Sequence, residues 1–188
     1  DTSVDDMLDN GGHVSVWINP KSDGEGSSGR IIGKGSGWFI ETIGESGGFV
    51  KLEFTYGFDT TDAKWETAAI VPINTLTKVD VYYNDDGSST PNPTMWINGL
   101  KYTVDNGGLT ETSTGSTSSV SDASGNLIIG NNSVSTLTFD GLIDEARVSD
   151  KQRLSSEVIT TYNAEKSDSD IITKGDELTQ WPFFAIIL

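Results

Sequence analysis

The sequence predicts an all-β fold, a jelly roll of two antiparallel sheets with one short C-terminal helix. The chain has 188 residues, which suits a single β domain, and 21 glycines, which suit many short strands joined by tight turns. Apolar and polar residues alternate along most segments, as in strands with one buried face. We assign residues 1–165 to the domain and residues 166–188 to a polar linker and an apolar C-terminal strand.

The first ten residues are acidic and carry few apolar anchors, so no strand is expected there. The first strand is expected at residues 12–20, where three β-branched residues alternate with polar residues and a tryptophan before Pro20 ends it. The further strands are expected at residues 30–34, 38–43, 49–56, 65–71, 77–83, 95–97, 102–104, 126–129 and 139–148. About ten strands suit a two-sheet jelly roll.

The last strand and the helix are expected within residues 139–163. In the strand, Asp144 shares its parity with Ala146 and Val148, so we expect all three side chains to point inward. After a polar turn, apolar residues recur at the spacing of one helical face, which predicts a helix over residues 154–163. Ser155 is the expected N-cap of this helix.

Residues 109–126 contain hardly any apolar side chains, and we expect an exposed loop there. Its serine and threonine hydroxyls are candidates for O-glycosylation. Asn131 begins an Asn-Asn-Ser sequon and is a candidate N-glycosylation site. A chain of this composition produces such matches by chance, which is the interpretation we favour.

Several segments resemble one family of extracellular and virion proteins. Residues 139–148 carry the pattern F-x-G-x-I-D-E-x-R-V, and a short helix with a leucine-serine start follows over residues 154–162. Residues 12–20, 31–35 (I-x-x-K-G) and 95–99 (MWING) match earlier strands in the same order. Together these segments resemble the laminin-G-like modules of the concanavalin A-like jelly-roll superfamily.

The resemblance implies a concanavalin A-like, non-catalytic extracellular module on a cell or virion surface. Relatives often hold a calcium ion at the rim of the sandwich. The family normally begins with an apolar strand that lies beside the closing strand, and residues 1–10 provide none. One edge of the sandwich is therefore expected to be open.

The charge balance limits the partners. The chain has 12 lysine and arginine residues against 28 aspartate and glutamate residues, a formal net charge of −16. A field of this sign repels nucleic acid and anionic lipid, so we expect no nucleic-acid partner and no membrane insertion. The absence of cysteine excludes disulfide bonds.

The sequence offers little for catalysis, and we predict that the protein is not an enzyme. A Ser-His-Asp arrangement needs a histidine, and His13, which is expected on a strand surface, is the only one. Retaining glycosidases need two carboxylates about 5 Å apart. Asp144 and Glu145 are adjacent, but neighbouring residues of a regular strand point to opposite faces.

Asp144 nevertheless needs a partner if it points inward, because a buried carboxylate requires compensation. One interpretation is a calcium site at the rim, with Asp140, Asp6 and Asp9 as further oxygen ligands. The alternative is a carboxylate that accepts backbone N–H bonds from a neighbouring loop. The residues alone leave both open.

Exposed tryptophans are typical of sugar-binding surfaces, and the chain has five. Trp38 and Trp65 lie next to turns and are the two candidates for a sugar platform. Packing between the sheets is the more frequent role for tryptophan in such strands.

The chain ends in a segment that is apolar on both faces and too short to span a membrane. It could insert into the open edge of the same sandwich, insert into that of the next copy, or pack with a segment that follows Leu188. Two functions follow: a subunit of a surface filament or virion appendage that self-assembles linearly by strand complementation, and alternatively a lectin-like carbohydrate-binding module, with or without calcium. The assembly strand would comprise Trp181, Phe183, Phe184, Ile186, Ile187 and Leu188.

Overall fold

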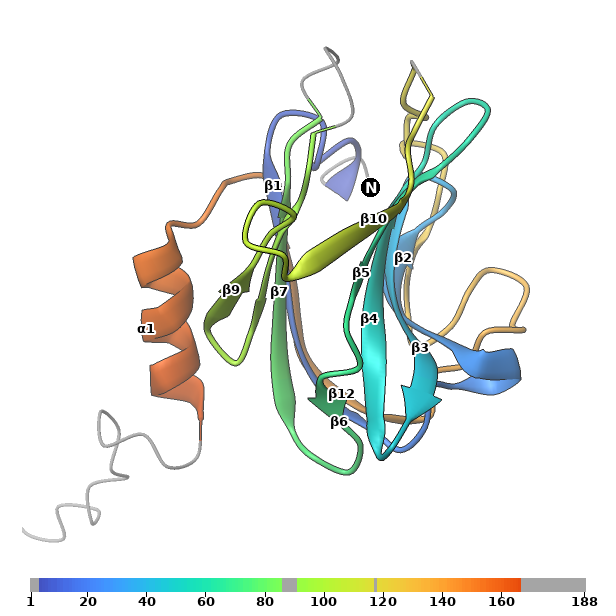
Figure 1. Cartoon of the computed structure of the whole chain (residues 1–188). Helices are drawn as coiled ribbons and strands as arrows, with labels where there is room; N and C mark the ends of the chain where they lie inside the picture. Colours follow the sequence, from blue (N-terminus) through green and yellow to red (C-terminus); the bar gives the residue numbers. More distant parts are fainter. Residues whose placement is uncertain (1–3, 86–90, 117, 167–188) are drawn as a thin grey trace, which may run out of the picture.

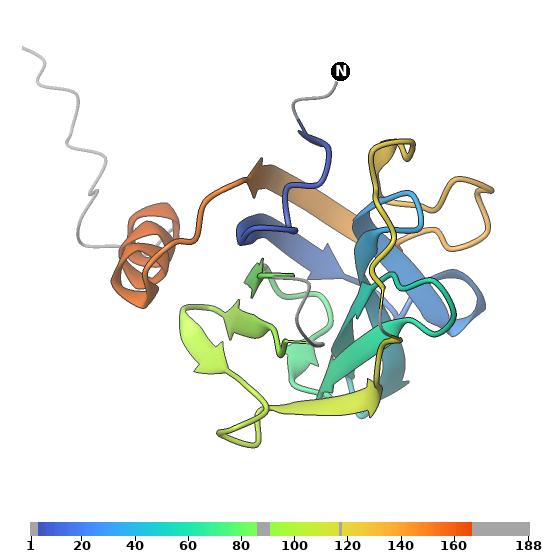
Figure 2. The same ribbon diagram turned by 90° about the horizontal axis from the view of Figure 1, so that it is seen from above.

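Two antiparallel sheets stack face to face, and one helix lies outside the first of them (Figures 1 and 2). The computed structural model describes residues 4–85, 91–116 and 118–166. The predicted class, an all-β jelly-roll sandwich with one short C-terminal helix, is confirmed. The C-terminal assembly strand lies outside the described residues, so strand complementation stays a prediction.

The strand order brings the two ends of the domain together in the first sheet. That sheet runs β12 (Gly141–Ser149), β1 (Gly12–Pro20), β7 (Thr77–Tyr83), β8 (Thr94–Ile97) and β9 (Leu100–Tyr102). The second sheet runs β10 (Leu109–Ser113), β5 (Ala63–Thr67), β4 (Phe49–Tyr56), β3 (Trp38–Ser46), β2 (Ser28–Lys34) and β11 (Leu127–Ile129), with the short β6 (Val71–Pro72) paired to β4. A 3-10 turn, η2 (Glu25–Ser27), precedes β2, and helix α1 (Ser155–Glu165) follows β12.

The core lies between the sheets and is centred on aromatic rings. Tyr83 of β7 packs against Phe54, Tyr56 and Trp65 of the second sheet, with ring centroids 4.4 to 5.6 Å apart. Trp38 and Trp65 are 1% and 0% exposed. Burying an apolar side chain of this size stabilises the fold by about 1.5–3 kcal/mol.

The N-terminal segment closes one end of the sandwich without forming a strand. Leu8 is buried in the core, and its carbonyl accepts the backbone N–H of Asp85. Lys34 is fully buried, and its Nζ donates to Asp5 Oδ1 at 2.7 Å and forms an ion pair with Asp122. Within the described residues β12 pairs on one side only, with β1.

A β-bulge interrupts the last strand. The pairing of β12 with β1 passes from Ser15 opposite Arg147 to Trp17 opposite Asp144, so one residue of β1 faces two of β12. Glu145 lies in this bulge with φ +51°, in the left-handed region.

The bulge changes which side chains of β12 face the core. Ile143 packs against the core before it, and Ala146 and Val148 pack against the core after it. Asp144 is exposed, so the expectation that it points inward is wrong. The alternation on which that expectation rested is broken at Glu145.

Two smaller expectations also need correction. Residues 109–113, expected in a loop, form edge strand β10, whose Leu109 is buried while its threonine and glutamate side chains are exposed. The N-cap of α1 is Leu154 rather than Ser155, because Glu157 accepts the backbone N–H of Leu154 at 2.7 Å.

We expect Glu145→Val to lower the free energy of unfolding by about 1–2 kcal/mol, because a β-branched residue is poorly tolerated in the left-handed region. Glu145→Asn should stay within about 0.5 kcal/mol of the parent, since asparagine tolerates that region. Both variants remove the same exposed ion pair with Arg147, which therefore cancels in the comparison. Urea unfolding measures the difference. If Glu145→Val were as stable as Glu145→Asn or more stable, as β-propensity alone predicts, residue 145 would not lie in a left-handed bulge.

Candidate functional site

A pocket of about 260 Å³ opens beside the C-terminal end of helix α1. Strands β1 and β12 form its walls, and the turn that precedes β7 forms its rim. We call it the Trp17 pocket. It is lined by Trp17, Leu76, Asp144, Glu145, Arg147 and Glu165.

Glu165 joins the helix to three strands at this pocket. Its Oε2 accepts Trp17 Nε1 at 2.9 Å and Lys78 Nζ at 2.5 Å, and its Oε1 accepts Arg147 Nη1 at 2.5 Å. Burial alone would raise the pKa of Glu165, but the hydrogen bonds from Lys78, Arg147 and Trp17 lower that pKa to about 2. The carboxylate is therefore ionised throughout the physiological pH range.

Arg147 is held from both ends of its guanidinium group. Nη1 donates to Glu165, and Nη2 donates to Glu145 Oε2 at 2.6 Å. The hydrogen bond to Glu165 is the main reason why the pKa of Arg147 is raised. The fork that could bind a ligand carboxylate is thus occupied by the protein's own acids.

The bulge turns Asp144 and Glu145 toward one pocket. A regular strand would place them on opposite faces, and that expectation is wrong for this chain. Asp144 Oδ1 accepts the backbone N–H of Glu145 at 2.8 Å, which stabilises the bulged backbone. Sequence reasoning missed this arrangement and the roles of Arg147 and Glu165, because nothing in the sequence around Glu145 marks a left-handed residue.

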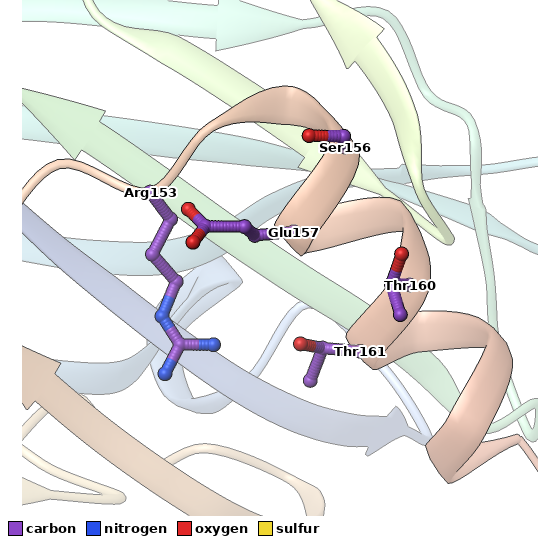
Figure 3. A pocket seen from close by; sticks show the side chains of 5 residues that line it. All are labelled: Arg153, Ser156, Glu157, Thr160 and Thr161. Atoms are coloured by element: carbon purple, nitrogen blue, oxygen red, sulfur yellow. The ribbon is translucent and has the colours of Figure 1, made fainter.

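A larger groove, of about 470 Å³, runs along helix α1 (Figure 3). The described residues that line it are of polar types and come from helix α1 and the segment before it (Figure 3). Its Glu157 carboxylate already caps the helix. The described lining is Arg153, Ser156, Glu157, Thr160 and Thr161, without an aromatic or apolar residue against which a sugar ring could pack.

The predicted metal ligands do not form a site. Asp140 accepts the Ser22 hydroxyl at one end of β1, whereas Asp6 and Asp9 lie beyond its other end, bonded to Asp122 N and Tyr56 OH. Exposed Asp144 lies between these ends, opposite Trp17. Within the described ranges no three or more His, Cys, Asp or Glu side chains are placed to hold a metal ion. Calcium dependence stays a prediction, but these four residues do not fit it.

The two predicted sugar platforms are also wrong. Trp38 and Trp65 are core residues, whose Nε1 groups donate to Asp122 Oδ2 and Asn92 Oδ1 at 2.9 Å. Packing between the sheets, the alternative interpretation, is confirmed. Asn131 lies in a loop where its Nδ2 donates to Thr138 Oγ1 at 2.9 Å, and glycosylation there stays a prediction.

His13 is buried, not on the strand surface. Its Nε2 lies 3.0 Å from Asp80 Oδ1, and Ser15 is nearby on the same strand face. These are the residue types of a hydrolytic triad, but Ser15 Oγ makes no hydrogen bond to His13 or to any other described residue. The three side chains are at most 3% exposed, which leaves no access for a substrate.

A row of glutamates crosses the outer face of the second sheet. Glu41 on β3 lies opposite Glu53 on β4, and Glu53 lies opposite Glu66 on β5. Each forms its own ion pair, with Arg30, Lys64 and Lys51 respectively. Burial raises the pKa of Glu41, and the charge of Arg30 opposes that rise. The row is thus internally neutralised rather than open to a substrate.

The comparisons with known proteins agree with this fold. A family model described as "Concanavalin A-like lectin/glucanases superfamily" matches residues 3–159. No curated protein matches the chain in sequence. Among the described residues, no helix has the length and apolar character needed to cross a membrane.

Three solved structures illustrate the likeness. A heptameric SAP-like pentraxin from Limulus polyphemus has a TM-score of 0.56 at 14% identity, covering 81% of this chain and 70% of that one. A putative carbohydrate binding protein from Bacteroides ovatus has a TM-score of 0.56 at 17% identity, covering 80% and 40%. The Ruminococcus gnavus sialidase module CBM40, bound to α2,3-sialyllactose, has a TM-score of 0.57 at 10% identity, covering 83% and 84%. At these identities the likeness shows the fold.

We expect Glu165→Gln to lower the free energy of unfolding by about 2–4 kcal/mol near neutral pH, because it leaves the buried Lys78 ammonium without its carboxylate. The pKa of Glu165 is about 2 in the folded chain against an ordinary value of 4.5, so its stabilisation is complete above pH 4.5 and is lost as the pH falls toward 2.

Thermal unfolding between pH 2 and 7 tests this expectation. Parent and variant should converge at low pH, whereas Glu111→Gln, at an exposed position on β10, should follow the parent throughout. A stability difference between the parent and Glu165→Gln that does not change with pH would contradict the assigned role.

Proposed function

The chain belongs to the concanavalin A-like lectin/glucanases superfamily, and we propose that it is a non-catalytic, extracellular glycan-binding module whose ligand occupies the Trp17 pocket. The main support for the proposal is the composition of this pocket, which combines carboxylate side chains with the apolar surface of Leu76 and Trp17. Its volume of about 260 Å³ lies just below the range of about 300–1,000 Å³ typical of sites for drug-sized ligands, which suits a single sugar ring.

The pocket's chemistry fits a sugar with free hydroxyl groups. Asp144 and Glu145 present carboxylate oxygens, which accept hydrogen bonds from hydroxyls. Leu76, which is 54% exposed, and the edge of the Trp17 indole offer apolar surface for the C–H groups of the ring. A sugar ring combines these two characters in one small ligand.

The ionisation of the pocket supports binding rather than glycoside hydrolysis. A general acid must carry a proton near neutral pH, and the pKa of Glu165 of about 2 is far below that range. Glu145 is bonded to Arg147 and belongs to the same ion-paired group. Glu165 therefore lacks the environment of a proton donor.

The same charges favour neutral sugars over acidic ones. Both ends of Arg147 are occupied, and the Lys78 side chain is fully buried, so neither cation of the pocket is open to a ligand carboxylate. The pocket holds three of the carboxylates that contribute to the net charge of −16. An acidic sugar would meet repulsion without a paired cation.

A glycan array with matched neutral and sialylated pairs tests the proposal, followed by calorimetry on the strongest ligand. We expect binding to neutral glycans, weakened about tenfold by Asp144→Ala, the effect of losing one hydrogen bond to a charged group. Asp105→Ala, which removes an equal charge in an exposed turn, should bind like the parent. If Asp144→Ala binds glycans as tightly as the parent, the ligand does not occupy the Trp17 pocket. If the parent binds no glycan on the array, the proposed function is wrong.

Filament assembly by strand complementation is the second candidate. It is favoured by β12, a nine-residue edge strand that pairs on one side only within the described part of the chain. The bulge and the charged side chains of β12 oppose strand addition, which is why we place glycan binding first.

Deleting residues 180–188 should convert assembled protein to monomers if the C-terminal strand links the copies. Sedimentation velocity of the intact and shortened chains distinguishes the cases. An intact chain that is already monomeric would exclude the filament.

A further inference from the structure

Helix α1 covers a polar face of the first sheet. His13 and Ser15 on β1, Asp80 on β7 and Trp96 on β8 share the face opposite to the core, and they are 2%, 3%, 1% and 2% exposed. They adjoin one another, since Ser15 pairs with Asp80 and Asp80 pairs with Trp96 across neighbouring strands. We call these four residues the polar cluster.

Helix α1 contacts residues next to the polar cluster on the same side of the sheet. Tyr162 of α1 packs on the Trp17 ring, with centroids 6.0 Å apart, and on Gly99 in the turn between β8 and β9. Val158 is the buried residue of the helix. Figure 1 shows α1 outside β1, β7 and β9, on the side away from the second sheet.

Each residue of the polar cluster has one polar atom without a protein partner. These atoms are His13 Nδ1, Ser15 Oγ, Asp80 Oδ2 and Trp96 Nε1, none of which has a hydrogen-bond partner within the described part of the chain. A buried polar atom left without a hydrogen bond destabilises a fold, and four of them would remove a large fraction of the stability of an ordinary domain. The polar cluster therefore requires a bound molecule that forms hydrogen bonds with these atoms.

We propose that one or more water molecules occupy a closed site in the polar cluster, and that helix α1 controls the exchange of this water with solvent. The bound molecule must accept a hydrogen bond from the Trp96 N–H and donate one to Asp80 Oδ2. Water does both, and buried waters typically make about three hydrogen bonds to otherwise unsatisfied groups. A metal cation does not fit, because the indole N–H can only donate.

Two attachments hold the cover in place. Glu165 bonds to Trp17, Lys78 and Arg147 at the C-terminal end of the helix, and Val158 provides the buried apolar contact. Loosening either attachment should open the hydrated site while leaving the core between the sheets closed. The indole N–H groups of Trp96 and Trp65 report on the two regions within one molecule.

Nuclear magnetic resonance of the intact chain, labelled with ¹⁵N, tests the occupancy of the site. The Trp96 indole N–H should show a direct cross-relaxation peak to a long-lived water molecule. The indole N–H of Trp65, a core residue whose Nε1 donates to Asn92 Oδ1, serves as the control and should show none. A Trp96 indole without water contact would overturn the proposal.

Hydrogen exchange tests the role of the helix. Glu165→Gln should accelerate exchange of the Trp96 indole N–H at least tenfold more than exchange of the Trp65 indole N–H, because the loss of global stability accelerates both whereas the opening of α1 accelerates only Trp96. Val158→Ala is the second variant, in case loss of the charge unfolds the chain, and should act in the same direction. The proposal that α1 covers the site is wrong if both variants accelerate exchange equally at Trp65 and Trp96. It is also wrong if neither variant accelerates exchange at Trp96.

Discussion

Burial of the first sheet on both faces is the constraint on which the rest of the structure depends. Its inner face packs against the second sheet, and its outer face carries His13, Asp80 and Lys78 beneath helix α1. Polar groups taken out of water need partners. The His13–Asp80 pair and the bonds of Glu165 to Trp17 and Lys78 meet part of that need, so the helix is attached by polar contacts as well as by apolar packing.

The bulge in β12 connects this constraint to the candidate site. It keeps Ala146 and Val148 on the core side while it turns Asp144 and Glu145 outward, next to Arg147. Without it, the register of β12 would place one of the two acids in the core. The left-handed conformation of Glu145 is a local cost, and such conformations persist where the surrounding structure fixes them and often where a protein binds ligands.

The fold was predictable from the sequence and the site was not, for reasons visible in single residues. Val14, Val16 and Ile18 alternate without interruption, so the pattern of β1 and the class of the fold follow from pleat geometry. Glu145 breaks the alternation of β12 although glutamate has no preference for the left-handed region. Pairing across the chain, as between Glu165 and Lys78, depends on topology that local patterns do not contain.

Several cations of the chain are engaged in its own ion pairs. Lys34 and Lys78 are fully buried, and Arg30 and Arg147 are held in ion pairs. Each of these cations is paired with the chain's own acids, so it compensates them and leaves the excess of 28 acids over 12 cations unneutralised. Long-range repulsion then acts on any anionic ligand before contact, and the occupied guanidinium of Arg147 offers no compensation at contact. The proposed selectivity against acidic ligands thus rests on the same ion pairs that stabilise the fold.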